Sequence, residues 1–434
     1  MGMGGILLRA ALARFVARAS AVASIGGRAA AAVSALARMR RAFWLRLRMN
    51  PRVVFGFFSL MSSVLAASAS STSVPEVTRV PAASAHGTAA SVRVADSPLV
   101  FTGPVYGLDG GAGFRAQAEQ GLKALAAVLG RQGSESREVV RLTAYVARES
   151  DVSDLRAAVA TAFRDMPVAF SYYCTPLEQS GALIAWEAVA RSTRRTDSVV
   201  VDAEAALMPA GARLFISGQA EKGTDVASAV KLTMAGLHRS LAHLGLTKAD
   251  VVQVKAFVRP MSDHAAARRE IAASFDGGPV PPAVIHEWVS ELYTEIEMVV
   301  SARRLPLQKE PITYAWLPWL NKSNRYCNVT TVAAGTPLIF IGAIDGGDAG
   351  DGRTQMKVIF ERLGSVLFDA GSSYRNLAKA TYVLADPATR AVLGDIRGVY
   401  FDPTRPPAAS ALNVRGTGVV GRAAWVDMIA VPGR

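Results

Sequence analysis

The feature that most constrains this chain is an internal repeat that occurs three times between residues 90 and 431. In each copy a short apolar strand runs into a glycine, which is Gly103, Gly218 or Gly342. A long helix, a second strand, a shorter helix and two closing strands follow in the same order. Because copies with one order and spacing indicate tandem structural units, we expect three α+β domains of roughly 105 residues each.

The central copy, residues 213–301, shows the pattern most clearly. In two segments its apolar residues recur every three or four positions, which gives a helix one buried face. In the segments between them apolar residues alternate with other residues, which gives a strand one buried face. Gly245 follows the first helix, and Gly277-Gly278-Pro279 follows the second. We predict helices at 226–244 and 263–275 and strands at 214–217, 250–258, 284–289 and 292–300.

The repeats predict the domain organisation of most of the chain. The first repeat covers residues 89–192, the second 196–303 and the third 326–432. Residues 305–325 join the second repeat to the third. This linker is rich in proline and carries the aromatic residues Tyr314, Trp316 and Trp319. So apolar a segment is expected to lie against the domains rather than in solvent.

The N-terminal segment has the composition of sequence that precedes a folded domain. Residues 1–48 contain nine arginines and neither lysine nor an acidic residue. They are either an Arg-rich leader or, as we favour, upstream sequence included by a start placed too early. Residues 49–69 then follow the pattern of a secretory signal peptide. Its parts are the positive Arg52, the apolar residues 53–65 and the cleavage motif Ala67-Ser68-Ala69.

This pattern predicts a secreted or periplasmic protein. The apolar stretch is shorter than the ~20 residues that cross a bilayer, so we expect no stable membrane insertion after cleavage. An uncleaved membrane anchor is the alternative. Residues 70–88, rich in Ser, Ala, Pro and Val, are expected to form a flexible tether.

The distribution of charge argues against nucleic acid as a partner. The formal net charge is +13, but ten of the 48 basic residues lie at or before Arg52, and no acidic residue precedes Glu76. The rest of the chain has 38 basic and 35 acidic residues, a net charge of +3. A protein with so small a net charge is only weakly attracted to the phosphate backbone of a nucleic acid.

The central copy resembles the RidA family of enamine/imine deaminases, also labelled L-PSP endoribonucleases. The resemblance lies in Leu-Phe-Ile-Ser-Gly-Gln at 214–219, in the strand at 250–258, in Pro-Pro-Ala at 281–283 and in Glu-Ile-Glu at 295–297. It implies a chorismate-mutase-like α+β fold and a homotrimer with ligand sites between neighbouring subunits. Three such domains in one chain therefore predict an intramolecular pseudo-trimer and a monomeric protein.

The resemblance also implies where a substrate carboxylate would be held. The family uses an arginine just after a Pro-Ala pair, because a guanidinium binds a carboxylate through two parallel hydrogen bonds. By sequence, that place falls on Ala169, Val284 and Ala409. The carboxylate clamp is thus missing from all three repeats, which puts the ordinary deaminase reaction in doubt.

The family's water-positioning glutamate has one match in the chain. It is Glu295 in the central repeat, whereas Ala185 and Trp425 take its place in the outer repeats. A carboxylate there acts in general acid/base catalysis. The alternative is that Glu295 is a polar residue on the solvent face of an edge strand.

The family's anchoring serine matches Ser217, against Thr102 and Ile341 in the outer repeats. Only the central repeat therefore keeps part of the site. We predict Glu295 as the catalytic residue and ligand contacts from Ser217, Gly218, Gln219 and Val284.

No cofactor or metal site is predicted. His238, His243, His264 and His286 lack the spacing that metal ligands require, and no phosphate loop or dinucleotide motif occurs. Residues 345–352, rich in Gly and Asp, predict a solvated turn. The two cysteines, Cys174 and Cys327, lie in different repeats, and free thiols are favoured over a disulfide.

Three functions remain open. The first, which we favour, is a protein with degenerate sites that binds a small molecule in an inter-repeat cleft. The second is an enamine/imine deaminase that acts through the central repeat. The third is a structural or interaction protein with empty clefts. A cavity beside Ser217 and Glu295, and the charge that lines it, would separate these hypotheses.

Overall fold

The structure, a computed structural model, describes residues 76–83, 87–108, 111 and 113–433. The predicted leader (1–48) and signal peptide (49–69) lie outside these residues. Within the described part of the chain, no helix combines the length and the apolar composition that a bilayer crossing requires.

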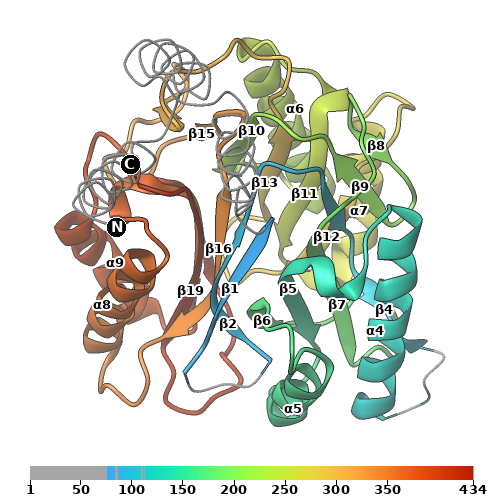
Figure 1. The fold of residues 1–434 in the computed structure, drawn as a ribbon, viewed down its shortest axis with the longest axis vertical. Coiled ribbons are helices and arrows are strands. Elements are labelled where there is room, and N and C mark those ends of the chain that lie inside the picture. The colour runs from blue at the N-terminus through green and yellow to red at the C-terminus, as the bar shows by residue number, and fades with distance from the viewer. Residues whose placement is uncertain (1–75, 84–86, 109–110, 112, 434) are drawn as a thin grey trace, which may run out of the picture. The chain divides into compact units, whose positions relative to one another are not determined.

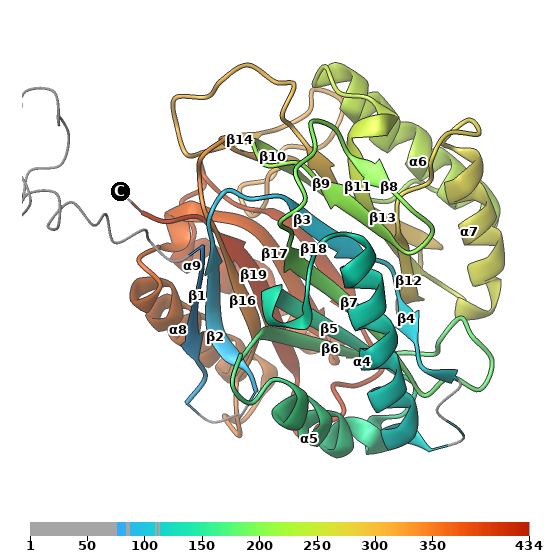
Figure 2. The same ribbon diagram turned by 45° about the vertical axis from the view of Figure 1, so that its right-hand side comes forward.

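Three mixed sheets form the framework (Figures 1 and 2). The first has the order β6-β5-β7-β3-β9-β8, and β4 pairs with β7 beside it. Its strands are β3 (Leu99–Thr102), β4 (Val105–Tyr106), β5 (Val139–Val146), β6 (Ala169–Cys174), β7 (Ile184–Arg191), β8 (Val200–Val201) and β9 (Ala205–Met208).

The second and third sheets have the same plan. The second has the order β12-β11-β13-β10-β15-β14 and the third β1-β2-β16-β19-β17-β18. The strands of the second are β10 (Arg213–Gln219), β11 (Val251–Val258), β12 (Ala283–Glu287), β13 (Thr294–Ser301), β14 (Ile312–Ala315) and β15 (Val329–Val332). Those of the third are β1 (Val77–Pro81), β2 (Ala89–Val94), β16 (Leu338–Asp345), β17 (Leu377–Leu384), β18 (Ala408–Asn413) and β19 (Ala424–Ala430).

A pair of helices covers one face of each sheet. The pairs are α4 (Phe114–Arg131) and α5 (Val152–Ala162), α6 (Val226–His243) and α7 (His264–Ala273), and α8 (Gly352–Asp369) and α9 (Pro387–Tyr400). Figure 1 shows α8 and α9 side by side on the sheet that contains β16 and β19. Short 3₁₀ turns precede several elements, at Ser136–Glu138, Glu149–Asp151, Lys248–Asp250, Met261–Asp263 and Tyr374–Asn376.

The helix boundaries follow from residues visible in the sequence. Gly133, Gly245 and Gly371 each lie two residues after the first helix of a repeat, with φ of 69°, 74° and 70°. Glycine adopts this left-handed conformation without the steric cost of a Cβ atom. At the start of α6, the Asp225 side chain accepts a hydrogen bond from the Ser228 N–H at 2.7 Å. The predicted helix at 226–244 therefore differs from α6 by one residue.

Four apolar clusters make up most of the core. Three of them lie between a sheet and its own helix pair. The fourth joins the opposite faces of all three sheets and includes Phe101, Phe215 and Phe340, one residue from each repeat. The mixed α+β fold with three sheets agrees with the fold class predicted from the sequence.

Each sheet is completed by a hairpin that leads into a different repeat. Hairpin β8–β9 precedes β10 but pairs with β3, and β14–β15 precedes β16 but pairs with β10. Hairpin β1–β2 precedes β3 but pairs with β16 of the third repeat. This corrects the expectation of a tether over residues 70–88, because β1 lies within it and its backbone groups pair with those of β2.

The linker at 305–325 packs against the domains, as predicted. Leu317 is buried in the core of the second repeat, and Tyr314 and Trp316 pack on the shared cluster. The guanidinium of Arg239 lies 4.1 Å from the centre of the Trp319 ring, a cation–π contact with helix α6.

Candidate functional site

The structure brings together two of the residues predicted for the central site, Gly218 and Glu295. A Cβ atom added to Gly218 would lie 2.0 Å from Oε1 of Glu295, so only glycine leaves room for this carboxyl group. Burial and the neighbouring charge of Glu297 raise the pKa of Glu295 to about 7, while Arg390 of α9 works in the opposite direction. A carboxyl group with such a pKa exchanges protons near neutral pH.

The other three predicted contact residues hold the fold together. The Ser217 hydroxyl donates to the Cys327 carbonyl at 2.6 Å and accepts from the Ala409 N–H at 2.8 Å. It thus ties β10 to β18 of the third repeat. The Gln219 amide donates to the Ser240 hydroxyl at 3.1 Å and so faces helix α6.

Val284 lies in a buried apolar cluster at which all three repeats meet. Its side chain is 1% exposed. The other buried members of the cluster are Tyr145, Tyr173, Ala185, Val383, Val414 and Trp425. The ligand contacts predicted for Ser217, Gln219 and Val284 stay a prediction.

Strand pairing corrects the sequence alignment of the first strand. Phe101, Phe215 and Phe340 each oppose the same position of the closing strand, at Val189, Val299 and Ile429. Ser217 therefore corresponds to Gly103 and Gly342, and not to Thr102 and Ile341. The alignment that matched Gly218 with Gly103 and Gly342 was therefore wrong by one residue. A shift of one residue moves a side chain to the opposite face of a strand.

The place of the missing arginine shifts in the same way. Lys255 opposes Val284, whereas the equivalent positions Thr143 and Thr381 oppose Ser171 and Ser410. Ser171 and Ser410, rather than Ala169 and Ala409, thus share the place of Val284. In either register, no arginine occupies it.

The sequence analysis missed three buried acids, Glu187, Glu297 and Asp427, at one position of the closing strands. Each forms an ion pair with a cation of another repeat. Lys255 Nζ lies 2.9 Å from Glu187, Lys379 Nζ 2.7 Å from Glu297, and an Arg141 nitrogen 2.8 Å from Asp427. The pairs run from the first repeat to the second, from the second to the third and from the third back to the first.

Two of these acids, Glu187 and Glu297, have a pKa below the ordinary value in spite of burial. Burial alone raises the pKa of a carboxyl group, but the attraction of Lys255 and Arg141 outweighs it at Glu187, whose pKa lies below its ordinary value. Lys379 and Lys255 do the same for the pKa of Glu297. An acid at the same place in all three closing strands was the signal available in the sequence.

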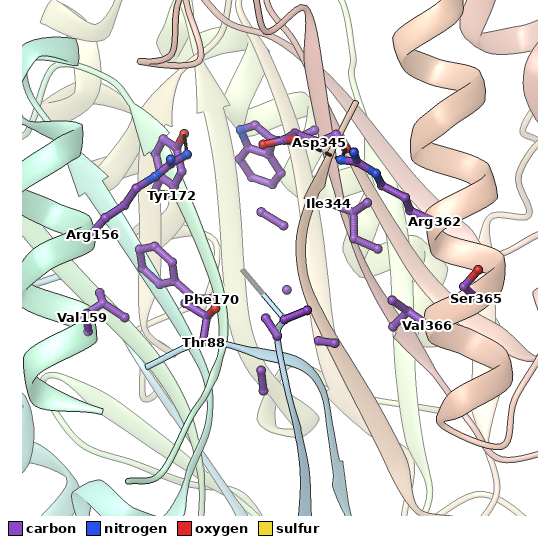
Figure 3. Close-up of a pocket in the computed structure, with 18 of the residues that line it drawn as sticks. Thr88, Arg156, Val159, Phe170, Tyr172, Ile344, Asp345, Arg362, Ser365 and Val366 are labelled. Carbon is purple, nitrogen blue, oxygen red and sulfur yellow. Dashed lines mark hydrogen bonds and ion pairs between the residues drawn. The ribbon is translucent and has the colours of Figure 1, made fainter. Parts of the chain in front are cut away.

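A pocket of about 800 Å³ lies between the first and third repeats (Figure 3). Helix α5 and strand β6 form one side, and the end of β16 and helix α8 form the other. Its lining includes Ala343 and Trp425, which are the counterparts of Gly218 and Glu295. The pocket thus occupies the place of the predicted central site, but at another junction between repeats.

The pocket combines an apolar lining with a small excess of positive charge. Phe170, Tyr172 and Trp425 supply aromatic surface, and most other lining residues are alanine, valine, isoleucine or glycine. Its charged residues are Arg156, Arg362 and Asp345. Figure 3 shows Arg156 beside Tyr172 on one side, and Arg362 with Asp345 on the other.

The two arginines differ in whether an acidic side chain lies beside the guanidinium. Arg362 donates to the Asp345 carbonyl at 2.7 Å and lies 3.4 Å from its carboxylate. Arg156 lies 3.4 Å from the Tyr172 hydroxyl, and it forms no ion pair with an acid in the described part of the chain. Nothing local in the sequence distinguishes Arg156, because its place beside the pocket results from the packing of α5 against the third repeat.

The described residues contain no group of three His, Cys, Asp or Glu side chains that could hold a metal ion. Cys174 and Cys327 are not bonded to each other, and burial raises the pKa of both thiols to about 12. In the Gly- and Asp-rich loop, Asp348 and Asp345 form ion pairs with Arg422.

Comparisons with known proteins find members of one family that are similar to this chain. A RutC family protein of Synechocystis is 37% identical over 65 residues, which are 15% of this chain and half the length of that relative. A member of the YjgF family from Mycobacterium tuberculosis is 30% identical, and the match covers 26% of this chain and 98% of that protein, with a TM-score of 0.21. A Rid family protein of Yersinia pestis is 21% identical over 27% of this chain and 98% of that protein, with a TM-score of 0.25.

No family model matches the chain. The curated match supports a relationship of this chain to the RutC/YjgF/RidA family. The matches to the mycobacterial and the Yersinia proteins each cover about the length of one repeat.

Proposed function

We propose that this protein binds a small, largely apolar anion in the pocket between helix α5 and helix α8. The observation that supports the proposal is the guanidinium of Arg156, which contacts Tyr172 but no acid among the described residues, at the edge of an apolar pocket of about 800 Å³. Pockets of this size and composition are typical of small-molecule sites. This favours a binding protein over a structural protein with empty clefts.

The chemistry of the lining argues for an aromatic carboxylate. Phe170, Tyr172 and Trp425 offer flat apolar surface, against which an aromatic ring packs favourably. Arg156 supplies paired N–H donors that match a carboxylate. With two arginines and one aspartate, the lining favours an anion over a cation.

Calorimetric titration of residues 70–434 with 1-naphthaleneacetate tests this proposal. Arg156→Ala should weaken binding about tenfold or more, since a charge-assisted hydrogen bond contributes roughly 1.5–3 kcal/mol. The matched control is Arg164→Ala, an exposed arginine just beyond α5 and outside the lining. Equal affinity of Arg156→Ala and the unaltered protein would contradict the proposal, as would the absence of binding.

We further propose that the three repeats form a pseudo-trimer within one chain. The exchanged hairpins and the three ion pairs both run around the repeats in a closed sequence. Asp96 adds a third link, because its carboxylate accepts hydrogen bonds from Gly211, Arg213 and Gly335, which belong to the second and third repeats. Cyclic arrangements of identical subunits close in the same way.

A second candidate function is enamine/imine hydrolysis at Glu295. Two observations favour it: the pKa of about 7 for this residue, and the approach of Arg390 and Lys379 from the third repeat. Val284 in the place of the family's arginine argues against the usual 2-imino acid substrates. An amino-acid-oxidase-coupled assay should therefore show negligible hydrolysis of 2-imino acids, and turnover abolished by Glu295→Gln would establish the second candidate instead.

We also propose that the protein is exported through the signal peptide at 49–69, on the basis of the sequence pattern alone. N-terminal sequencing of the native protein should find a chain that begins near Ser70. A mature chain that retains residues before Met49 would contradict this proposal.

A further inference from the structure

We infer that the N-terminal hairpin β1–β2 is a clasp that closes the chain onto its third repeat and completes the pocket, so that anion binding and hairpin docking stabilise each other. The inference deepens the proposed function and rests on it for the ligand. The closure itself rests on strand pairing and on contacts of the hairpin with two repeats.

The topology makes this hairpin different from the other two. Hairpins β8–β9 and β14–β15 lie within the chain, each between two repeats that it also links covalently. The junction between the first and third repeats has no such linker. There, β2 pairs with β16 from Val94 opposite Leu338 to Ser91 opposite Ile341. Val92 and Val94 are fully buried in the shared core.

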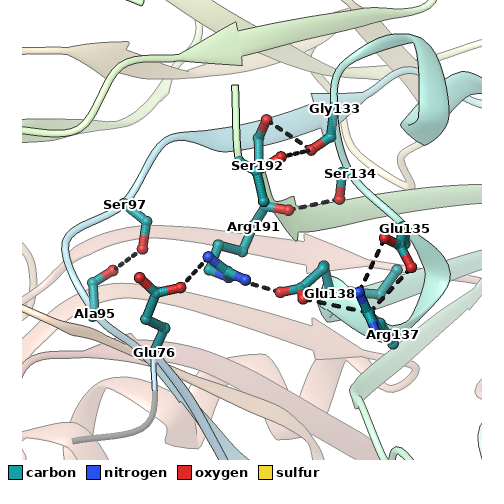
Figure 4. Close-up of polar contacts among 12 residues, drawn as sticks. Glu76, Ala95, Ser97, Gly133, Ser134, Glu135, Arg137, Glu138, Arg191 and Ser192 are labelled. Carbon is teal, nitrogen blue, oxygen red and sulfur yellow. Dashed lines mark hydrogen bonds and ion pairs between the residues drawn. The ribbon is translucent and has the colours of Figure 1, made fainter. Parts of the chain in front are cut away.

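The same hairpin is fastened to the first repeat by its polar groups. The Arg79 guanidinium donates to the carbonyls of Val139, Pro167 and Arg137 at 2.8, 2.9 and 2.7 Å. Glu76 forms an ion pair with Arg191, which also holds Glu138 at 2.7 Å (Figure 4). These contacts connect β1 and the residue before it to one end of the first sheet, where β5 and β6 begin and β7 ends.

Gly87, shortly before β2, lies closely against helix α5. Gly87 has φ of 76°, and a Cβ atom there would lie 2.4 Å from the Val159 carbonyl oxygen. Only glycine therefore allows this approach. Beside it, the Ala89 N–H donates to the Val168 carbonyl at 2.8 Å. The hairpin thus contacts the first repeat at Gly87 and Ala89 and pairs with the third along β2.

The hairpin also forms one wall of the pocket. Ala82, Ala83, Thr88, Ala89 and Ala90 belong to the lining, together with α5 and β6 of the first repeat and β16 and α8 of the third. Undocking of the hairpin would remove this wall and the only backbone pairing described between β16 and its outer neighbour. The pocket described here therefore exists only in the docked state.

Thermodynamic linkage follows from this arrangement. A ligand that binds only the docked state stabilises that state, and the docked state raises the apparent affinity for the ligand by the same free energy. Because the hairpin is tethered to the first repeat, docking is intramolecular and needs no partner chain. Weakening the contacts of the hairpin should therefore weaken anion binding without any change to Arg156.

Hydrogen exchange of residues 70–434, measured by mass spectrometry, tests the clasp without a ligand. Arg79→Ala should speed exchange about tenfold or more in 89–94 and 338–341, because hydrogen bonds to a charged group are lost. The equivalent pairing of β10 with β15 should keep its exchange rate. Thr78→Ala, an exposed neighbour on β1, is the matched control. Glu76→Gln provides a milder variant, with a smaller change in the same direction.

Titration of the same proteins with 1-naphthaleneacetate tests the linkage. Arg79→Ala should raise the Kd for the probe by the same factor by which it weakens docking of the hairpin. Thr78→Ala should have the Kd of the unaltered protein. Unchanged exchange in Arg79→Ala and Glu76→Gln would overturn the clasp, whatever the probe does. Faster exchange with unchanged affinity would overturn the linkage. A probe that fails to bind the unaltered protein overturns the proposed function and the linkage, while the exchange rates still decide on the clasp.

Discussion

Glu295 and Trp425 occupy the same place in two repeats, and their chemistry sets the two clefts apart. Glu295 packs over Gly218 as a part-buried carboxyl group, whereas Trp425 presents an aromatic ring to an open pocket. In the first repeat the place belongs to Ala185, which is buried in an apolar cluster. One family position has thus taken three different roles within a single chain.

The raised pKa of Glu295 makes the stability of the protein depend on pH. Its carboxyl group binds a proton more tightly in the folded state, with a pKa of about 7, than at the ordinary value of 4.5. The resulting stabilisation is fully present below about pH 4.5 and is lost as the pH rises through about 7. Between pH 4.5 and pH 8, the unaltered protein should lose up to roughly 3 kcal/mol of its free energy of unfolding through this group. Glu295→Gln should not show this loss.

Chemical denaturation of both proteins at these two pH values measures the difference. Glu291→Gln, which changes an exposed glutamate four residues earlier, is the matched control and should follow the unaltered protein. Parallel pH dependence of Glu295→Gln and the unaltered protein would show that Glu295 titrates at its ordinary pKa.

The roles of residues that depend on packing between repeats could not be predicted from the sequence. The sequence analysis selected Glu295 and Gly218, because both belong to motifs of adjacent strands in one repeat. It did not select Arg156, which is one exposed arginine among many until α5 is placed against the third repeat. Glu187 and Asp427 were visible as a recurring acid, but nothing local showed that a cation of another repeat would reach them.

At the level of strands and helices, the elements were predictable and their pairing was not. Apolar spacing and the glycines at Gly133, Gly245 and Gly371 located the long helices closely. Matching Gly218 with Gly342 placed β10 and β16 one residue out of correspondence, because the two glycines occupy different positions relative to the closing strand. A match on buried phenylalanines rather than on glycines would have given the correct register, because the phenylalanines share one cluster.

The pairing of each hairpin with a different repeat was likewise not predictable from the sequence. The strand β2 is followed by β3 after only four residues, so local pairing of the two was the natural expectation. In the structure β2 pairs with β16 instead, where it covers the edge of that strand and places Val92 and Val94 in the cluster shared by all three repeats. Such a choice depends on the arrangement of three repeats, which no single repeat specifies.

For the molecule as a whole, the closed set of contacts predicts how the chain behaves in solution. Each sheet already receives its outer hairpin from the same chain, and each buried acid already has its cation. Light scattering should therefore find residues 70–434 to be monomeric at all concentrations. A stable trimer of the full chain would mean that repeats from different chains pair with one another, and the pseudo-trimer would have to be abandoned.

The isolated central repeat, residues 196–303, should behave differently. It lacks β14 and β15, so one edge of β10 loses its pairing partner, and its β8–β9 hairpin has lost the first sheet. It also keeps Glu297 without Lys379 and Lys255 without Glu187, and unpaired buried charges are costly. Open strand edges pair readily with other chains. We therefore expect this fragment to form trimers or larger aggregates under conditions in which the full chain is a monomer, and a stable monomeric fragment would show that the exchanged hairpins and ion pairs contribute little to the fold.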